Sequence, residues 1–210
     1  MTYPAVPGQV APEVLLVPPL RRPRLDRLAG WISNATHPPI IGAFVVLVAA
    51  LVSARLTAWL WGALYLGLAV LLPTLYVAWL LRRGQITDMQ LPDRRQRFKP
   101  YCVAIACMGL AALTLNAAHA PRLLQQIALI NVIQSSALFL ITLRWKVSAH
   151  CASMSGLAVL AWTLFGSGGL PFGVAVPVVA WARVRLKRHD YAQVIAGALL
   201  GAAAAWIVLR

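Results

Sequence analysis

The sequence has little charge, and it is especially poor in acidic residues. Only 11% of its 210 residues are charged, and five of these are Asp or Glu. A soluble domain usually carries about 25% charged residues. Hydrophobic residues make up 60% of the chain, and the mean hydropathy is +0.75. Several continuous apolar runs approach or exceed the roughly 20 residues that cross a bilayer as a helix. This composition excludes an ordinary soluble domain and predicts an all-α, polytopic transmembrane helical bundle of about six to seven spans.

Cysteine is also scarce. The three cysteines, Cys102, Cys107 and Cys151, show neither C-x-x-C nor zinc-ligand spacing, and each lies in or beside an apolar run. We interpret them as small buried hydrophobic residues and expect no metal site. The N-terminus lacks the charged-then-apolar order of a signal peptide. Its prolines at positions 4, 7, 12, 18 and 19 predict an irregular tail instead.

Seven apolar segments are predicted as helices, at about residues 39–54, 57–81, 101–118, 122–143, 150–166, 170–183 and 191–209. The sixth is short and contains Pro171 and Pro177, which predicts a tilt or a break there. We expect one transmembrane domain over residues 38–210, preceded by an irregular, basic tail over residues 1–37. Within that tail, RRPRLDRLAGWI (21–32) has the composition of a short amphipathic helix in the head-group layer.

The formal net charge of +14 comes from cations that lie in the loops between the apolar runs. Membrane topology and anionic head groups or phosphates therefore explain it better than nucleic acid does, and we expect no nucleic-acid partner. The N-terminus contains four Lys and Arg residues, loop 82–100 six, loop 144–149 two and loop 183–190 four. If these segments share one side of the membrane, that side holds 16 of the 19 Lys and Arg residues. The positive-inside rule then places the motif loops and the N-terminus in the cytoplasm, for a protein of a prokaryotic-type plasma membrane. The arginines at 21–27 support this orientation independently, because they lie outside any candidate site.

Three of these loops contain residue types that suit the same chemical reaction. They contain TDMQLPDRRQRFKP (87–100), RWKVSAHCAS (144–153) and ARVRLKRHDYAQ (182–193). An even number of predicted helices separates each loop from the next, so they share one membrane surface. Together they place His150 and His189 among many fixed cations. Cations neutralise the charge of a phosphoryl transition state, one imidazole can attack phosphorus, and another can protonate the leaving oxygen. The three loops therefore predict a phosphoryl-transfer site.

The order and spacing of these loops resemble the type 2 phosphatidic acid phosphatase superfamily, which includes membrane lipid phosphatases and the vanadium haloperoxidases. Its motifs K-x6-R-P, P-S-G-H and S-R-x5-H-x3-D correspond here to Q-x6-R-F (90–98), V-S-A-H (147–150) and A-R-x5-H-x3-Q (182–193). The third match is the most specific, since Arg183 and His189 have the family's separation. The resemblance covers most of the chain from about residue 40 onward.

This resemblance implies a phosphatidic acid phosphatase type 2-like core and a hydrolase that needs no metal or other cofactor. By the same resemblance, His189 is the nucleophile that forms a phosphohistidine, and His150 is the general acid. Arg97, Arg183 and Ser148 are implied to bind the phosphate. The implied substrate is a lipid phosphate or a (poly)prenyl (di)phosphate, and membrane lipids are the other expected partners.

Two positions depart from the family pattern. Gln90 stands where the family has its first lysine, and the candidates to replace that cation are Arg94, Arg95 and Lys99. Lys146 in the second loop is a further candidate phosphate ligand. Gln193 stands where the family has the aspartate that orients the nucleophile. At i+4 it shares a helical face with His189, and its amide oxygen can accept the Nδ1 proton. It cannot stabilise an imidazolium ion, and the comparable Asp→Asn change in a serine-protease triad costs about 10⁴ in rate.

These departures leave a second function open, namely a catalytically weak or inactive relative that binds anionic lipid or acts as a membrane partner protein. Asp190 points about 100° away from His189 on a helix and is not expected to replace the missing aspartate. His37 and His119 are interpreted as solvated or capping residues. Gly197 and Gly201 form a G-x-x-x-G pair in the last helix, which predicts close helix packing within the fold. The oligomeric state is left open.

Overall fold

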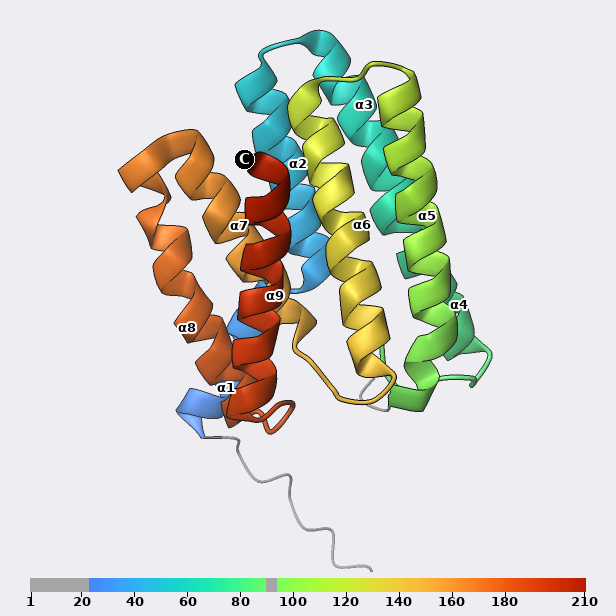
Figure 1. Ribbon diagram of the computed structural model, residues 1–210. Helices are drawn as coiled ribbons and strands as arrows, with labels where there is room; N and C mark the ends of the chain where they lie inside the picture. The colour runs from blue at the N-terminus through green and yellow to red at the C-terminus, as the bar shows by residue number, and fades with distance from the viewer. Residues whose placement is uncertain (1–22, 90–93) are drawn as a thin grey trace, which may run out of the picture.

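The computed structural model describes residues 23–89 and 94–210, and this part of the chain is helical without a strand (Figure 1). The prediction of an all-α protein is thus confirmed. In chain order, the elements are α1 (Arg24–Ala35), α2 (Pro38–Ser53), α3 (Leu56–Leu66), η1 (Gly67–Leu71), α4 (Leu72–Arg82), η2 (Arg94–Arg97), α5 (Phe98–Ala117), α6 (Arg122–Thr142), α7 (Ala149–Phe165), η3 (Gly166–Gly169), α8 (Leu170–Arg185) and α9 (Tyr191–Leu209).

All seven predicted apolar helices are present, and their ends differ from the predicted ones by at most three residues, at Phe98 against 101. Five helical stretches are long and apolar enough to cross a membrane, or six if the bent pair of α1 and α2 is one span. One of the five is the stretch Ala149–Arg185, in which the chain reverses at η3 between α7 and α8 (Figure 1). The described part of the chain is therefore compatible with an integral membrane protein.

Proline shapes two of these helices in different ways. The stretch Leu56–Arg82 is continuous but contains a π-helical turn, η1, directly before Pro73. A proline ring clashes with the carbonyl four residues earlier, and a π turn changes the register of the helix locally. In the shorter α8, Pro171 lies in the first turn, where its missing N–H has no cost, and Pro177 lies in the interior of an unbroken helix. Of the two predicted effects of these prolines, a break is therefore wrong, since α8 is one continuous helix, and a tilt stays a prediction.

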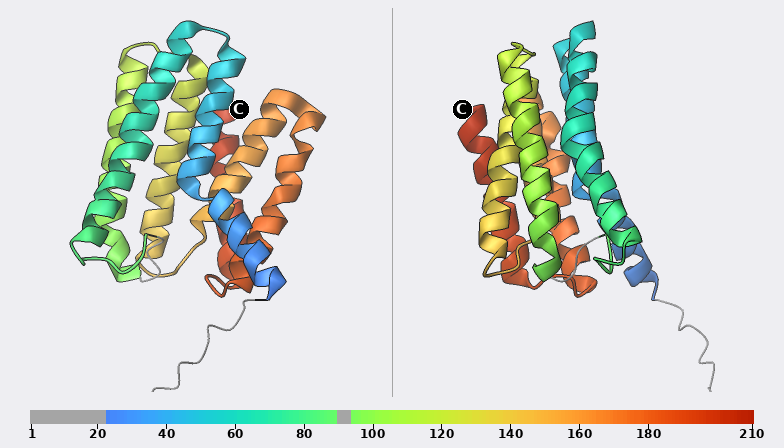
Figure 2. Two further views of the ribbon diagram at one scale, coloured as in Figure 1. Left: turned by 180° about the vertical axis from the view of Figure 1, so that it is seen from behind. Right: turned by 90° about the vertical axis from the view of Figure 1, so that its right-hand side faces the viewer.

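The three motif loops come to one end of the bundle, as their even separation predicted. Figures 1 and 2 show the α4–α5, α6–α7 and α8–α9 connections at the same end, together with α1. We call this the basic end, defined by residues 23–37, 83–89, 94–98, 143–150 and 183–190. Helix α1 exposes Leu25, Leu28 and Trp31, as suits the predicted helix in the head-group layer. Its placement in the cytoplasm stays a prediction.

Helices α7 and α9 approach each other closely through small residues. Gly197 and Gly201 lie so near α7 that a Cβ atom on either would overlap a backbone carbonyl oxygen, that of Ser148 for Gly197 and that of Ala152 for Gly201. Glycine is the residue that lets two helix backbones approach to this degree. The prediction of close packing within the fold is thus confirmed.

Hydrogen bonds between α7 and α9 add to this packing. The Ser155 hydroxyl donates to the Ala198 carbonyl at 2.7 Å. At the basic end, the backbone N–H of Ser148 donates to the Gln193 carbonyl at 3.2 Å. In an apolar surrounding, a polar group left without a partner is costly, so these bonds also favour one register of α7 against α9. The register of the two helices fixes how their first turns face each other.

We expect Gly197→Ala to destabilise the protein by about 1–3 kcal/mol, because the new Cβ pushes α9 away from the Ser148 carbonyl. The measurement is the thermal unfolding midpoint of the detergent-solubilised protein. Gly173→Ala in α8 is the matched control, because a Cβ there meets open space. Equal midpoints for the two variants would contradict the close approach of α7 and α9.

Candidate functional site

Four helix ends carry candidate residues into the interior of the basic end. Arg97 precedes α5, His150 lies in the first turn of α7, Arg183 lies in the last turn of α8, and His189 precedes α9. The exposed fractions of these residues are only 8%, 5%, 4% and 9%, respectively. Arginine is almost never fully buried unless it is paired, because burial of a charge is costly. Burial of these polar and charged side chains therefore points to a site rather than to surface anchoring.

These side chains form one electrostatic group. His189 interacts with the charges of Arg183, Lys146 and Arg97, and His150 interacts with Arg183 and His189. We call these five residues the basic site. The structure thus brings together residues from all three motif loops, including the two histidines, both motif arginines and Lys146.

The nucleophile candidate has a defined tautomer. His189 Nδ1 lies 2.9 Å from Gln193 Oε1, and an amide oxygen can only accept, so Nδ1 carries the proton and Nε2 keeps its lone pair. The contact expected from their i+4 spacing is confirmed. Asp190 instead caps α9, where its carboxylate accepts from the Gln193 N–H at 2.8 Å. No described contact joins the Asp190 carboxylate to His189, in line with the expectation that it points away from that ring.

Burial and neighbouring cations keep His189 neutral. Burial, followed by Arg183, Lys146 and Arg97, lowers the pKa of His189 to about 4, although the hydrogen bond to Gln193 opposes the shift. The pKa of Lys146 is lowered as well, first by burial and then by Arg97, Arg183 and Arg188. The cations of the site therefore repel one another, and a bound anion would relieve this repulsion.

The remaining candidate phosphate ligands have different surroundings. Ser148 is fully buried and caps α7, where its hydroxyl accepts from the Cys151 N–H at 3.4 Å, and its contact with phosphate stays a prediction. Lys99 is exposed in the first turn of α5, and no described contact joins it to the basic site. Arg94 begins the turn η2, but its side chain lies outside the described part, as does the whole of Gln90.

Helix α1 and the turn that follows it contribute two residues that the motifs did not indicate. Arg183 Nη1 donates to Ser33 Oγ at 2.6 Å, and the ring of His37 lies edge-on to that of His150, with centroids 5.3 Å apart. His37 occupies the N-cap position of α2 and is partly exposed, in line with its interpretation as a residue at a helix end, but its ring makes no capping hydrogen bond and packs on His150 instead. The one sequence signal is the spacing of Ala29 and Ser33, small residues at i and i+4 that are both buried.

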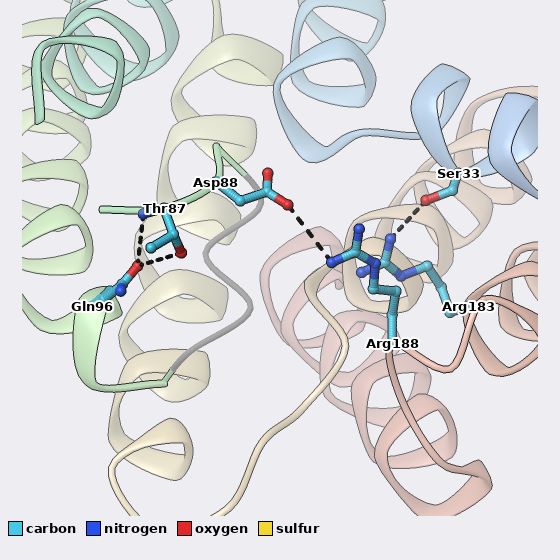
Figure 3. A network of polar contacts seen from close by, with 6 residues as sticks. All are labelled: Ser33, Thr87, Asp88, Gln96, Arg183 and Arg188. Atoms are coloured by element: carbon cyan, nitrogen blue, oxygen red, sulfur yellow. Dashed lines mark hydrogen bonds and ion pairs between the residues drawn. The ribbon is translucent and has the colours of Figure 1, made fainter. Parts of the chain in front are cut away.

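An ion pair joins the first motif loop to the third, with Asp88 3.7 Å from Arg188. Within the first loop, the Thr87 N–H donates to the Gln96 side chain at 3.2 Å. In Figure 3, Arg188 lies beside Arg183, whose guanidinium points toward Ser33. The loop before η2 thus reaches the α8–α9 connection from the side opposite α1.

In comparisons with known proteins, no family model, no curated protein and no solved structure matches the chain. The family resemblance of the three motifs therefore stays a hypothesis that the geometry supports or weakens. Chemically, the basic site combines a neutral imidazole with a free Nε2, a second buried imidazole and three cations. This set of groups suits the binding of a phosphate and an attack on its phosphorus atom.

The lowered pKa of His189 predicts an acid-sensitive fold. Unfolded histidine titrates near 6.5, so neutral His189 contributes stability that is fully present above about pH 6.5 and is lost as the pH falls toward and through about 4. We expect His189→Asn to remove on the order of 2 kcal/mol of this pH dependence. The measurement is the unfolding midpoint between pH 7.5 and pH 4. His119→Asn, an exposed position at the other end of the bundle, should keep the wild-type slope. A wild-type slope in His189→Asn would contradict a buried neutral imidazole.

Proposed function

We propose that the chain is an integral membrane phosphatase that hydrolyses a lipid phosphate or a (poly)prenyl (di)phosphate through a phosphohistidine, in the manner of the type 2 phosphatidic acid phosphatases. One observation carries the proposal: the neutral, buried His189 lies among Arg97, Arg183 and Lys146 at one end of an apolar helical bundle. Surface anchoring would leave these cations exposed. A phosphate ester, with about −1.5 to −2 charges, matches their number and their burial.

The reaction follows from the two imidazoles. His189 Nε2 attacks phosphorus while the bond from phosphorus to the ester oxygen breaks, and Arg97 and Arg183 stabilise the phosphoryl oxygens. Protonated His150 gives its proton to the leaving oxygen, since the phosphate dianion favours the imidazolium form. Water then attacks the phosphohistidine, gives a proton to His150, and releases phosphate and free His189. No metal or other cofactor enters these steps.

A small groove with a volume of about 40 Å³ lies beside the site, between α2, α6 and α7. It begins at Pro38 and Ser153, the first adjacent to His37 in the chain and the second one turn from His150, and continues toward Leu160. Its apolar lining residues include Ile41, Val45, Ile127, Ile130 and Leu157. This volume is too small for a lipid tail, so the tail of the substrate is not placed in this groove.

The purified protein should release phosphate from phosphatidate, from a polyprenyl diphosphate, or from both, and His189→Asn should lower that rate by at least about 10³-fold. The reason is that asparagine removes the attacking Nε2 while it keeps a side chain of polar character. Released phosphate is measured in detergent micelles, with His119→Asn as the control. Full activity in His189→Asn would rule out the phosphohistidine mechanism.

Gln193 favours a second candidate function, a catalytically weak or inactive relative that binds anionic lipid or a membrane partner protein. Its amide fixes the tautomer of His189 but carries no charge to stabilise the imidazolium that forms during attack. The basic site would then hold a phosphate head group without turnover.

Gln193→Asp separates the two functions. For a phosphatase, we expect turnover to rise by about tenfold or more, because the carboxylate stabilises the phosphorylated imidazolium. Gln193→Leu, which lacks an acceptor, should lower it. Turnover that begins only in Gln193→Asp would support the inactive relative, whereas high and equal turnover in the wild type and Gln193→Asp would show that glutamine is competent.

A further inference from the structure

Helix α1 lies directly against the basic site, although the motifs all come from later parts of the chain. It packs on α8 at the basic end, and Asp26 forms an ion pair with Arg185 at 2.8 Å (Figures 1 and 2). On its inner side, Ala29 and Ser33 are 0% and 1% exposed. The inner face of α1 therefore forms one wall of the basic site.

Ser33 lies beside both Arg183 and His150 of the basic site. Its hydroxyl accepts a 2.6 Å hydrogen bond from Arg183 Nη1 (Figure 3), and its backbone lies close enough to the His150 imidazole to interact with it. His150 Nε2 has no hydrogen-bond partner among the described residues. A backbone carbonyl beside a histidine ring can fix the tautomer of the ring and so orient its free nitrogen.

The hydrogen bond that Arg183 donates to the Ser33 hydroxyl has a comparable effect on the guanidinium group. When arginine binds an anion, rotation about several of its side-chain bonds is restricted, which costs conformational entropy. A neighbour that already holds the planar guanidinium group in place reduces that cost. Ser33 is itself almost fully buried, so its position is fixed by the packing of α1 on α8. One residue thus orients the phosphate ligand of one helix and the acid of another.

We propose that Ser33 is a positioning residue of the phosphate site, and that α1 has to be docked on α8 for Arg183 and His150 to be held in place. This inference rests on the proposed phosphatase function and extends it to a segment outside the three motifs. The site then depends on a helix that the sequence pattern assigns to the head-group layer alone.

The first experiment measures orthovanadate affinity by calorimetry, together with kcat and KM for the lipid substrate, in the full-length protein. We expect Ser33→Ala to weaken orthovanadate binding and raise KM by about tenfold, with a smaller effect on kcat, because the backbone contact to His150 remains. Ser33→Thr keeps a hydroxyl and should restore most of the affinity. Asn34→Ala, at the exposed neighbouring position, is the control and should bind as the wild type does.

Several results would overturn the inference. Unchanged binding in Ser33→Ala would show that the hydroxyl does not position Arg183. Tighter binding would show that Ser33 competes with phosphate for the guanidinium. Failure of Ser33→Thr to recover would mean that the packing of residue 33, rather than its hydroxyl, is what the site needs. Unfolding midpoints of the variants show whether each one is folded when it is measured.

A second pair of variants tests the docking of α1. Asp26→Arg and Arg185→Asp each place like charges where the ion pair was, so each should weaken orthovanadate binding, and the double variant should recover it. Wild-type binding in both single variants, or no recovery in the double variant, would contradict the role of docking.

The experiments distinguish failure of the proposed function from failure of the role proposed for Ser33. If the wild type neither binds orthovanadate nor releases phosphate, the phosphatase proposal is wrong, and the inference falls with it. If the wild type does both and Ser33→Ala is unchanged, only the inference is wrong.

Discussion

The close approach of α7 to α9 is the constraint on which the site depends. Gly197 removes the Cβ that would meet the Ser148 carbonyl, and this brings the first turns of the two helices together. The first turn of α7 carries His150, and the start of α9 carries Gln193 with His189 just before it. Because Ser148 and Gln193 also share a backbone hydrogen bond, any shift between the helices changes the position of both imidazoles at once.

This packing has to support an unfavourable group of charges. Arg97 and Arg183 are buried. Burial of Lys146 and His189 themselves, together with the positive charges of these arginines, lowers the pKa values of those two residues. Such an arrangement lowers the stability of the chain, and proteins retain it mainly at functional sites. The rigid contact between α7 and α9 supplies the stability that the basic end lacks.

The sequence predicted what depends on local pattern and spacing. Long apolar runs determined the helices, and the i+4 relation of His189 and Gln193 determined their hydrogen bond. It did not predict the contact of Ser33 with Arg183, which joins residues 150 positions apart and depends on how α1 docks. The composition of α1 is also that of an ordinary interfacial helix, so its inner face left no motif. The unbroken α8 escaped prediction for a related reason, because neighbouring helices in a bundle can stabilise a helix across a proline such as Pro177.

Under the proposed function, Gln193 and the surrounding cations together determine how the basic site would bind and react with a phosphate. An aspartate at this position would neutralise one cation, whereas glutamine fixes the tautomer of His189 and leaves the site one unit more positive. The phosphate is then bound more strongly in the ground state, but the imidazolium formed on attack is stabilised less. Binding that is equally strong before and during reaction lowers KM without raising kcat. The two proposed functions, a slow phosphatase and a lipid-phosphate binder, thus differ in degree rather than in kind, and the charge at position 193 would determine which of them the chain is nearer to.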